Sequence, residues 1–92
     1  MYVTIRAYQG NTELAEALAA REDELKDVIG GIDGFRAYYL MKIAEGTATV
    51  SVFDSKEGAD ESTAAAAAWL RENLPGMQAT PYVTSGEAVV SF

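Results

Sequence analysis

The spacing of hydrophobic positions changes several times along this chain. Residues 3–8 and 35–53 are rich in β-branched and aromatic side chains, and this pattern predicts one strand and then a hairpin of two. Between them, apolar residues from Leu14 to Ile32 recur at intervals of three, four or seven, which is typical of a helix. A second helical pattern occupies residues 55–74, and residues 88–92 are predicted to form the closing strand. The predicted order gives an α+β fold: a four-stranded antiparallel sheet with two helices on one face.

Both predicted helices have recognisable ends. Asn11 and Thr12 are candidate caps for the first helix, because their side-chain oxygens can accept hydrogen bonds from unpaired backbone N–H groups. Glycines at positions 30, 31 and 34 are predicted to end it. Ser55 is predicted to begin the second helix, and Pro75 followed by Gly76 to end it. Residues 76–81 are then expected to be a loop before the last strand.

Alternation along the strands assigns side chains to the two faces of the sheet. With a tight turn at Glu45-Gly46, the face expected to meet the helices carries Val3, Ile5, Ala7, Tyr39, Met41, Ile43, Ala48, Val50 and Val52. The uncovered face is expected to carry Tyr2, Thr4, Arg6, Tyr8, Arg36, Tyr38, Leu40, Lys42, Thr47, Thr49, Ser51 and Phe53. A slip of one residue would invert the middle strand, so the faces taken by Tyr38 and Tyr39 stay open. The aromatic content of the uncovered face predicts that a second copy covers it in a homodimer.

Composition narrows the classes of function. A length of 92 residues predicts one domain spanning residues 1–92. The net charge of −7, with 14 acidic against 7 basic residues, argues against a nucleic-acid partner. No signal peptide is predicted at the N-terminus, and no apolar run approaches the roughly 20 residues that span a bilayer. We therefore expect a cytoplasmic protein without a membrane partner.

Two stretches of the sequence resemble the antibiotic biosynthesis monooxygenase family. They are residues 32–40, Ile-Asp-Gly-Phe-Arg-Ala-Tyr-Tyr-Leu, and residues 49–59, where Phe-Asp-Ser-Lys-Glu leads from the third strand into the second helix. The order of elements extends the resemblance over nearly the whole chain. It implies a ferredoxin-like fold, a dimeric α+β barrel in which two sheets face each other, and a ligand pocket between each sheet and its helices. Members include cofactor-independent monooxygenases of phenols and quinones, haem-degrading enzymes and proteins without an assigned activity.

The chain departs from that family at positions that matter for chemistry. It contains no histidine, so the helix histidine that ligates haem in the haem-degrading members has no counterpart. The first-strand asparagine of several catalytic members is also missing, because Arg6-Ala7-Tyr8-Gln9 occupies that stretch. Without cysteine or histidine, the usual nucleophile–base pairs are excluded, and a zinc or iron site is not expected. We therefore expect no metal and no cofactor.

The remaining candidates for a site are aromatic and basic side chains. Arg36 or Arg6 could bind a phenolate or carboxylate, while Phe35, Tyr39 and Trp69 offer flat surfaces to an aromatic ligand. Each also has a structural interpretation: Trp69 and Tyr39 as core residues, and Arg36 as the partner of Asp54 across the hairpin. The catalytic residues stay unassigned. Two hypotheses remain, a cofactor-independent monooxygenase or binder of aromatic or quinone-like metabolites, and a non-catalytic ligand-binding or structural homodimer.

Overall fold

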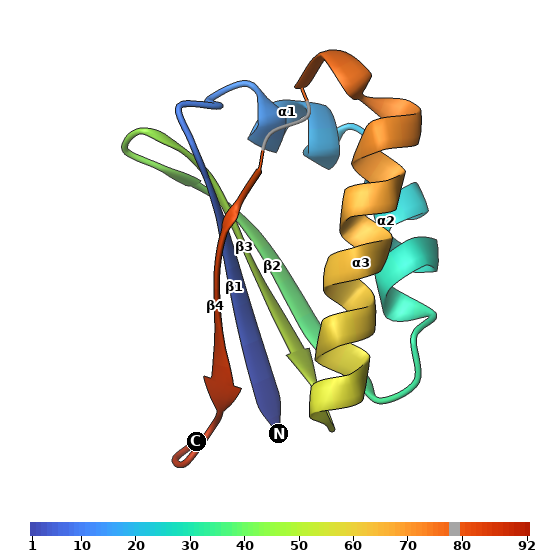
Figure 1. Cartoon of the computed structure of the whole chain (residues 1–92), viewed down its shortest axis with the longest axis vertical. Helices are drawn as coiled ribbons and strands as arrows, with labels where there is room; N and C mark the ends of the chain where they lie inside the picture. The colour runs from blue at the N-terminus through green and yellow to red at the C-terminus, as the bar shows by residue number, and fades with distance from the viewer. Residues whose placement is uncertain (78–79) are drawn as a thin grey trace.

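In the residues that the structure describes, four antiparallel strands and three α-helices make up a ferredoxin-like α+β fold (Figure 1). The computed structural model describes residues 1–77 and 80–92. The elements are β1 (Tyr2–Gln9), α1 (Leu14–Ala19), α2 (Glu22–Gly30), β2 (Phe35–Ile43), β3 (Gly46–Phe53), α3 (Lys56–Asn73), a short 3₁₀ turn η1 (Pro75–Met77) and β4 (Tyr82–Glu87). All helices lie on one side of the sheet, as the sequence pattern predicts.

The strand order is β2-β3-β1-β4, so the first and third strands are neighbours at the centre of the sheet. The hairpin of β2 and β3 turns at residues 44 and 45, because Ile43 pairs with Gly46. This is one residue before the predicted Glu45-Gly46 turn. The predicted face sharing is nevertheless confirmed, since Met41 lies opposite Ala48 and Tyr39 opposite Val50. An irregularity between Phe35 and Ala37 interrupts this register at the start of β2.

The prediction of which face meets the helices is wrong, and the sheet has the opposite orientation. The side chains buried beneath the helices are Thr4, Arg6, Tyr8, Thr47, Thr49, Ser51 and Phe53. The aliphatic face is the open one: Ile5 is 41% exposed, Met41 43% and Tyr39 61%. Tyr38 points to the helix side and Tyr39 to the open side.

The composition of α3 explains this orientation. Its inner side offers Ser62 and Thr63, whose hydroxyl groups accept hydrogen bonds from the Arg6 guanidinium at 3.4 Å and 3.0 Å. Ser51 on β3 accepts a third, at 2.9 Å. Since buried polar groups are stable only when they are hydrogen-bonded, a strand carrying Arg6 can face a helix that supplies hydroxyl groups. The alternating pattern of the strands alone does not contain this information.

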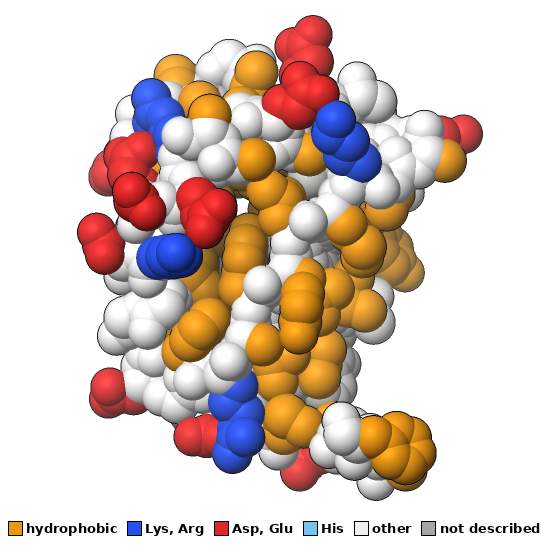
Figure 2. Space-filling model, turned by 180° about the vertical axis from the view of Figure 1, so that it is seen from behind, with side chains coloured by type: hydrophobic (Ala, Val, Ile, Leu, Met, Phe, Trp, Pro, Cys, Tyr) orange, Lys and Arg blue, Asp and Glu red, His pale blue; other side chains and the backbone are white. Residues whose placement is uncertain are grey.

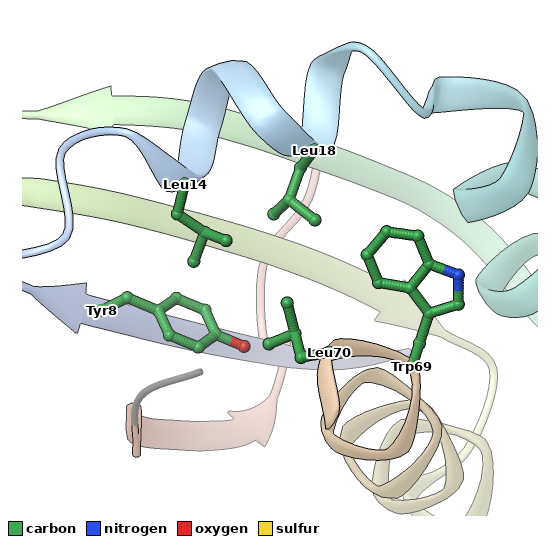
Figure 3. Close-up of a cluster of buried hydrophobic side chains, with 5 residues drawn as sticks. All are labelled: Tyr8, Leu14, Leu18, Trp69 and Leu70. Atoms are coloured by element: carbon green, nitrogen blue, oxygen red, sulfur yellow. The ribbon is translucent and has the colours of Figure 1, made fainter. Parts of the chain in front are cut away.

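The core between sheet and helices consists of two neighbouring clusters. In one, Leu14 and Leu18 of α1 pack with Trp69 and Leu70 of α3 over Tyr8 of β1 (Figure 3). In the other, Ile29, Ile32 and Ala59 surround Phe53, whose ring meets that of Phe35 edge to face at a centroid distance of 5.7 Å. Trp69 is thus a buried core residue, 7% exposed.

The first predicted helix is divided into α1 and α2 at residues 20 and 21. The backbone of Arg21 leaves the helical region there, with φ −118° and ψ 35°. The guanidinium of Arg21 lies 5.7 Å from the centre of the Trp69 ring and donates a hydrogen bond to Asn73. These contacts connect the segment between α1 and α2 to α3. No helix in the described part of the chain is long and apolar enough to cross a membrane.

The predicted caps have different outcomes. Asn11 and Thr12 do not cap the first helix: α1 is preceded by Glu13, without a side-chain capping bond. The Asn11 amide donates instead to the carbonyl oxygen of Met77 at 2.8 Å, joining the loop after β1 to η1. Ser55 does cap α3, where its hydroxyl accepts from the backbone N–H of Gly58.

The closing strand lies earlier than predicted. β4 is formed by Tyr82–Glu87, and residues 88–92 are not in a strand. The register explains the difference: Tyr2 at the start of β1 already pairs with Glu87, so residues beyond 88 extend past the end of β1. The predicted loop at 76–81 precedes β4, although its residues 78 and 79 lie outside the described chain.

Candidate functional site

A groove of about 610 Å³ opens between α1, α2 and the edge strand β2. Its lining is mainly apolar, from Leu18 and Ala19 of α1, Leu25, Ile29 and Gly30 of α2, and Phe35, Tyr38 and Leu40 of β2. Glu22 and Lys26 supply its charged part. Figure 2 shows the hollowed face, with hydrophobic side chains in and beside the hollow and charged side chains along one side. The volume lies within the roughly 300–1,000 Å³ typical of small-molecule pockets.

A small void of about 20 Å³ adjoins the inner part of this groove. Leu18, Leu25, Ile29 and Tyr38 line both spaces, so the two spaces meet along these side chains. The void is also lined by Arg6, Tyr8, Val28, Thr49, Ala66, Trp69 and Leu70. A volume of roughly 10–15 Å³ is enough for one water-sized group. The groove therefore has an apolar outer part. Next to it is an inner void, large enough for a single oxygen atom, whose mainly apolar lining also includes Arg6, Thr49 and two tyrosines.

Arg6 is the central polar residue of the inner void. It is 1% exposed, and its hydrogen-bond acceptors, Ser51, Ser62 and Thr63, are all neutral hydroxyl groups. Its Nε has no well-aligned hydrogen-bond partner among the described residues, and neither does Oγ1 of Thr49, which is 2% exposed. Thr49 nevertheless lies close enough to the Tyr38 hydroxyl group to oppose part of the rise in the pKa of that phenol. Arg6 and Thr49 are directly opposed on β1 and β3, so their side chains share the helix-covered face. Two residues that each carry a buried polar atom without a well-aligned partner thus line the same void.

Tyr8 and Tyr38 complete the polar surroundings of Arg6. Burial raises the pKa of both phenols above the ordinary value of 10.0, and the nearby positive charge of Arg6 opposes that rise. Both phenols therefore stay protonated at neutral pH. Since a neutral phenol neutralises no charge, the Arg6 guanidinium keeps an uncompensated positive charge inside the fold.

The residues predicted for the site are divided between two parts of the molecule. Phe35 lines the groove, and Arg6 and Trp69 line the inner void. Arg36 is 58% exposed and forms an ion pair with Asp54 across the hairpin. Tyr39 lies on the open face of the sheet. The structure therefore brings three of the five predicted residues together, and leaves Arg36 and Tyr39 outside both spaces.

The sequence interpretation missed Thr49, Tyr38 and the α2 side of the groove as site residues. Thr49 could have been found from strand pairing, because the register that places Thr47 opposite Tyr8 also places Thr49 opposite Arg6. The groove itself could not, because it depends on the break between α1 and α2. Within the described residues, no group of three or more acidic, histidine or cysteine side chains is arranged to bind a metal ion.

Comparisons with known proteins establish the fold. No family model matches the chain, and no curated protein matches it. A MhuD variant with two manganese protoporphyrin IX molecules per active site superimposes with a TM-score of 0.73 at 18% identity, covering 100% of this chain and 98% of its own. A monooxygenase from the gene ActVA-Orf6 of Streptomyces coelicolor, bound to nanaomycin D, gives 0.66 at 16%, covering 99% and 89%.

A third similar structure is a dimeric ferredoxin-like protein from an uncultured marine organism. Its TM-score is 0.68 at 17% identity, and the match covers 99% of this chain and 95% of that one. At such identities the likeness shows a shared fold. The chain thus has a ferredoxin-like fold, which the ActVA-Orf6 monooxygenase shares.

Proposed function

We propose that the protein binds a small, flat aromatic or quinone-like metabolite in the groove between α1, α2 and β2. The observation that carries this proposal is the groove itself, about 610 Å³ in volume and mainly apolar in its lining. Phe35 and Tyr38 give aromatic surfaces on the strand side, and Leu25 and Ile29 give aliphatic surfaces on the helix side. A planar ring system between them would bury most of its surface, which is the main source of affinity in such sites.

A second candidate function is cofactor-independent oxygenation of the bound molecule. It is supported by the fold shared with the ActVA-Orf6 monooxygenase and by the buried charge of Arg6, which could stabilise an electron-rich phenolate. A suitable reaction converts a ring methylene into a carbonyl: one oxygen atom of O₂ enters the product, and the other leaves as water with the two methylene hydrogens. The substrate supplies all the electrons, so no cofactor is required. A metalloporphyrin such as MhuD binds would find no histidine ligand in this chain.

We also propose that two copies associate through the open face of the sheet. That face carries Ile5, Tyr39 and Met41, each more than 40% exposed, together with Tyr82 of the edge strand at 75%. A monomer rarely exposes so continuous an apolar surface to water. One structure with this fold is described as dimeric, and an isologous contact of sheet on sheet would cover the face in both copies.

Ligand binding can be tested by fluorescence, because Trp69 is the single tryptophan and borders the inner void. We expect saturable quenching by hydroxylated anthraquinones. Ala19→Phe should weaken it at least tenfold, because Ala19 lines the groove and a phenyl group there would fill part of it. Ala20→Phe is the matched control, since the neighbouring Ala20 is also exposed but is not part of the lining. Equal affinities for the two variants would place the ligand elsewhere.

Oxygenation can be tested with 1,8-dihydroxyanthrone, which contains a ring methylene between phenolic rings. We expect one mole of O₂ to be consumed for each mole of quinone formed, faster than in the protein-free solution, and expect Ala19→Phe to slow the reaction. Binding without any acceleration over the protein-free rate would favour the non-catalytic alternative.

A further inference from the structure

Arg6 has surroundings that are unusual for a buried cation. The residue is 1% exposed, and all the groups that accept hydrogen bonds from its guanidinium are uncharged hydroxyls. Transfer of a charge into a protein interior is costly unless an opposite charge accompanies it. Within the described chain, no carboxylate forms an ion pair with Arg6. The ion pairs that do form there join exposed side chains at the surface. The site therefore lacks a negative charge.

The unpartnered atoms indicate where such a charge would lie. Nε of Arg6 can only donate a hydrogen bond, and Oγ1 of Thr49 can donate or accept one; both are buried, and both residues line the 20 Å³ void. An oxygen atom in the void could accept from both at once. The volume is large enough for one oxygen atom.

We propose that the ligand of the groove is an anion, and that its oxyanion enters the inner void to bind Nε of Arg6 and Oγ1 of Thr49. The inference rests on the proposed function, since it uses the same groove for the ring system. It adds the chemical class, an ionised phenol or enol, and the orientation, with the charged oxygen toward β1 and the ring toward α2. Trp69 lies at the side of the void and would border the oxygen-bearing end of the ring.

The other titratable groups near Arg6 agree with this assignment. Tyr8 and Tyr38 border the void, and burial raises the pKa of each, so neither supplies a negative charge at neutral pH. Glu22 and Lys26 face the outer part of the groove, and they are not part of the lining of the void. The ionised oxygen of the ligand would thus be the only anion in direct contact with the guanidinium.

The test uses 6-cyano-2-naphthol, a two-ring phenol whose absorbance changes when it ionises slightly above neutral pH. Its pKa is measured free and in the presence of saturating protein, with the methyl ether of the same compound as a ligand that cannot ionise. We expect the bound pKa to fall by about one unit, which means that the phenolate binds tenfold more tightly than the phenol. The ether should bind at least tenfold more weakly than the phenolate.

Three variants locate the effect. Arg6→Met keeps an unbranched side chain in the core and should abolish the pKa shift while still binding the ether. Thr49→Val replaces the hydroxyl group with a methyl group of similar size and should reduce the shift. Arg36→Gln is the control, because Arg36 pairs with Asp54 outside the groove and its loss should leave the shift unchanged. If Arg6→Met does not fold, the wild-type shift together with the Thr49→Val variant still decides the question.

The possible results separate the two proposals. A bound pKa that is unchanged or raised in the wild type, with the naphthol and its ether bound equally well, would overturn the anion assignment and leave the aromatic groove intact. If neither compound nor the anthraquinones bind, both proposals are wrong. A shift that persists in Arg6→Met would contradict the role of Arg6.

Discussion

Tyr8 and Tyr38 show how burial changes a single residue. Each carries its hydroxyl group on the helix-covered side of the sheet, and burial raises the pKa of each above 10.0 despite the neighbouring Arg6 charge. A raised pKa in the folded state means that the unfolded chain releases its proton first as the pH rises. The corresponding part of the stability is therefore complete below pH 10 and is lost above it.

We accordingly expect the free energy of unfolding, measured by urea denaturation, to fall between pH 9 and pH 11. Tyr38→Phe removes the ionising group and keeps the ring, so the fall should be smaller in this variant. Tyr39→Phe serves as the control, since it removes the same hydroxyl from a ring that is 61% exposed. An equal fall in the two variants would contradict the assignment.

At the scale of single residues, the sequence indicated which kinds of side chain could bind a phenolate, but not which residue of each kind lies at the groove. Arg6, Phe35 and Trp69 were predicted because a cation and aromatic rings suit a phenolate, and they line the groove and its inner void. Arg36 was predicted by the same reasoning but pairs with Asp54 at the surface. The difference between Arg6 and Arg36 is their surroundings in three dimensions, namely the hydroxyl groups that α3 brings to Arg6 from 56 and 57 residues away.

Among the elements, the β-hairpin shows what local pattern can predict. The turn lies one residue earlier than predicted, which shifts the pairing by two residues and places Met41 opposite Ala48, yet the sharing of faces followed from alternation, which is a local property. The last strand did not, because its limits are set by pairing with β1, and Tyr2 of β1 is already opposite Glu87. The exposed apolar residues Val89 and Phe92 resemble strand residues only in composition.

The close approach of β3 to β1 makes a prediction about Gly46. A Cβ at this position would overlap the carbonyl oxygen of Tyr8, so Gly46→Ala requires the backbone to move. We expect the free energy of unfolding to fall by about 2 kcal/mol or more, within the range for overpacking. Gly86→Ala is the matched control in another strand, where a Cβ meets no atom within 4 Å, and a change of no more than about 0.5 kcal/mol is expected. Similar unfolding midpoints in urea for both variants would contradict this, because they would show that the backbone accommodates a Cβ at position 46 without a loss of stability.

For the whole molecule, the orientation of the sheet decides which surface is left uncovered. The hydroxyl-rich face carrying Arg6 lies under the helices, and the face carrying Ile5, Tyr39 and Met41 is open. Sequence alternation separated the two faces correctly but could not choose between them, because both contain aromatic residues. The choice depends on contacts between distant segments, and above all on the hydroxyl groups of Ser62 and Thr63.

The proposed dimer can be tested by placing a charge on the open face. Tyr39→Asp should yield a monomer in light scattering at concentrations where the wild type is a dimer, because an unpaired carboxylate in an apolar interface is costly. Ala64→Asp adds the same charge at an exposed position of α3 and should leave the dimer intact. A dimeric Tyr39→Asp variant would show that the copies associate through a different surface, or not through the sheet at all.

The break between α1 and α2 has a consequence for how the groove is reached. α2 is nine residues long, has one buried residue, Ile29, and begins without a side-chain cap, whereas α3 has eighteen residues, of which five are buried. Helices shorter than about 12–15 residues are marginal on their own, so the amide hydrogens of α2 should exchange with deuterium well before those of α3. Mass spectrometry of the exchanging protein can measure this, and equal rates in the two helices would contradict it. The groove then has one firm side, β2 and the sheet behind it, and one side that opens transiently, which admits a rigid ring system without unfolding the core.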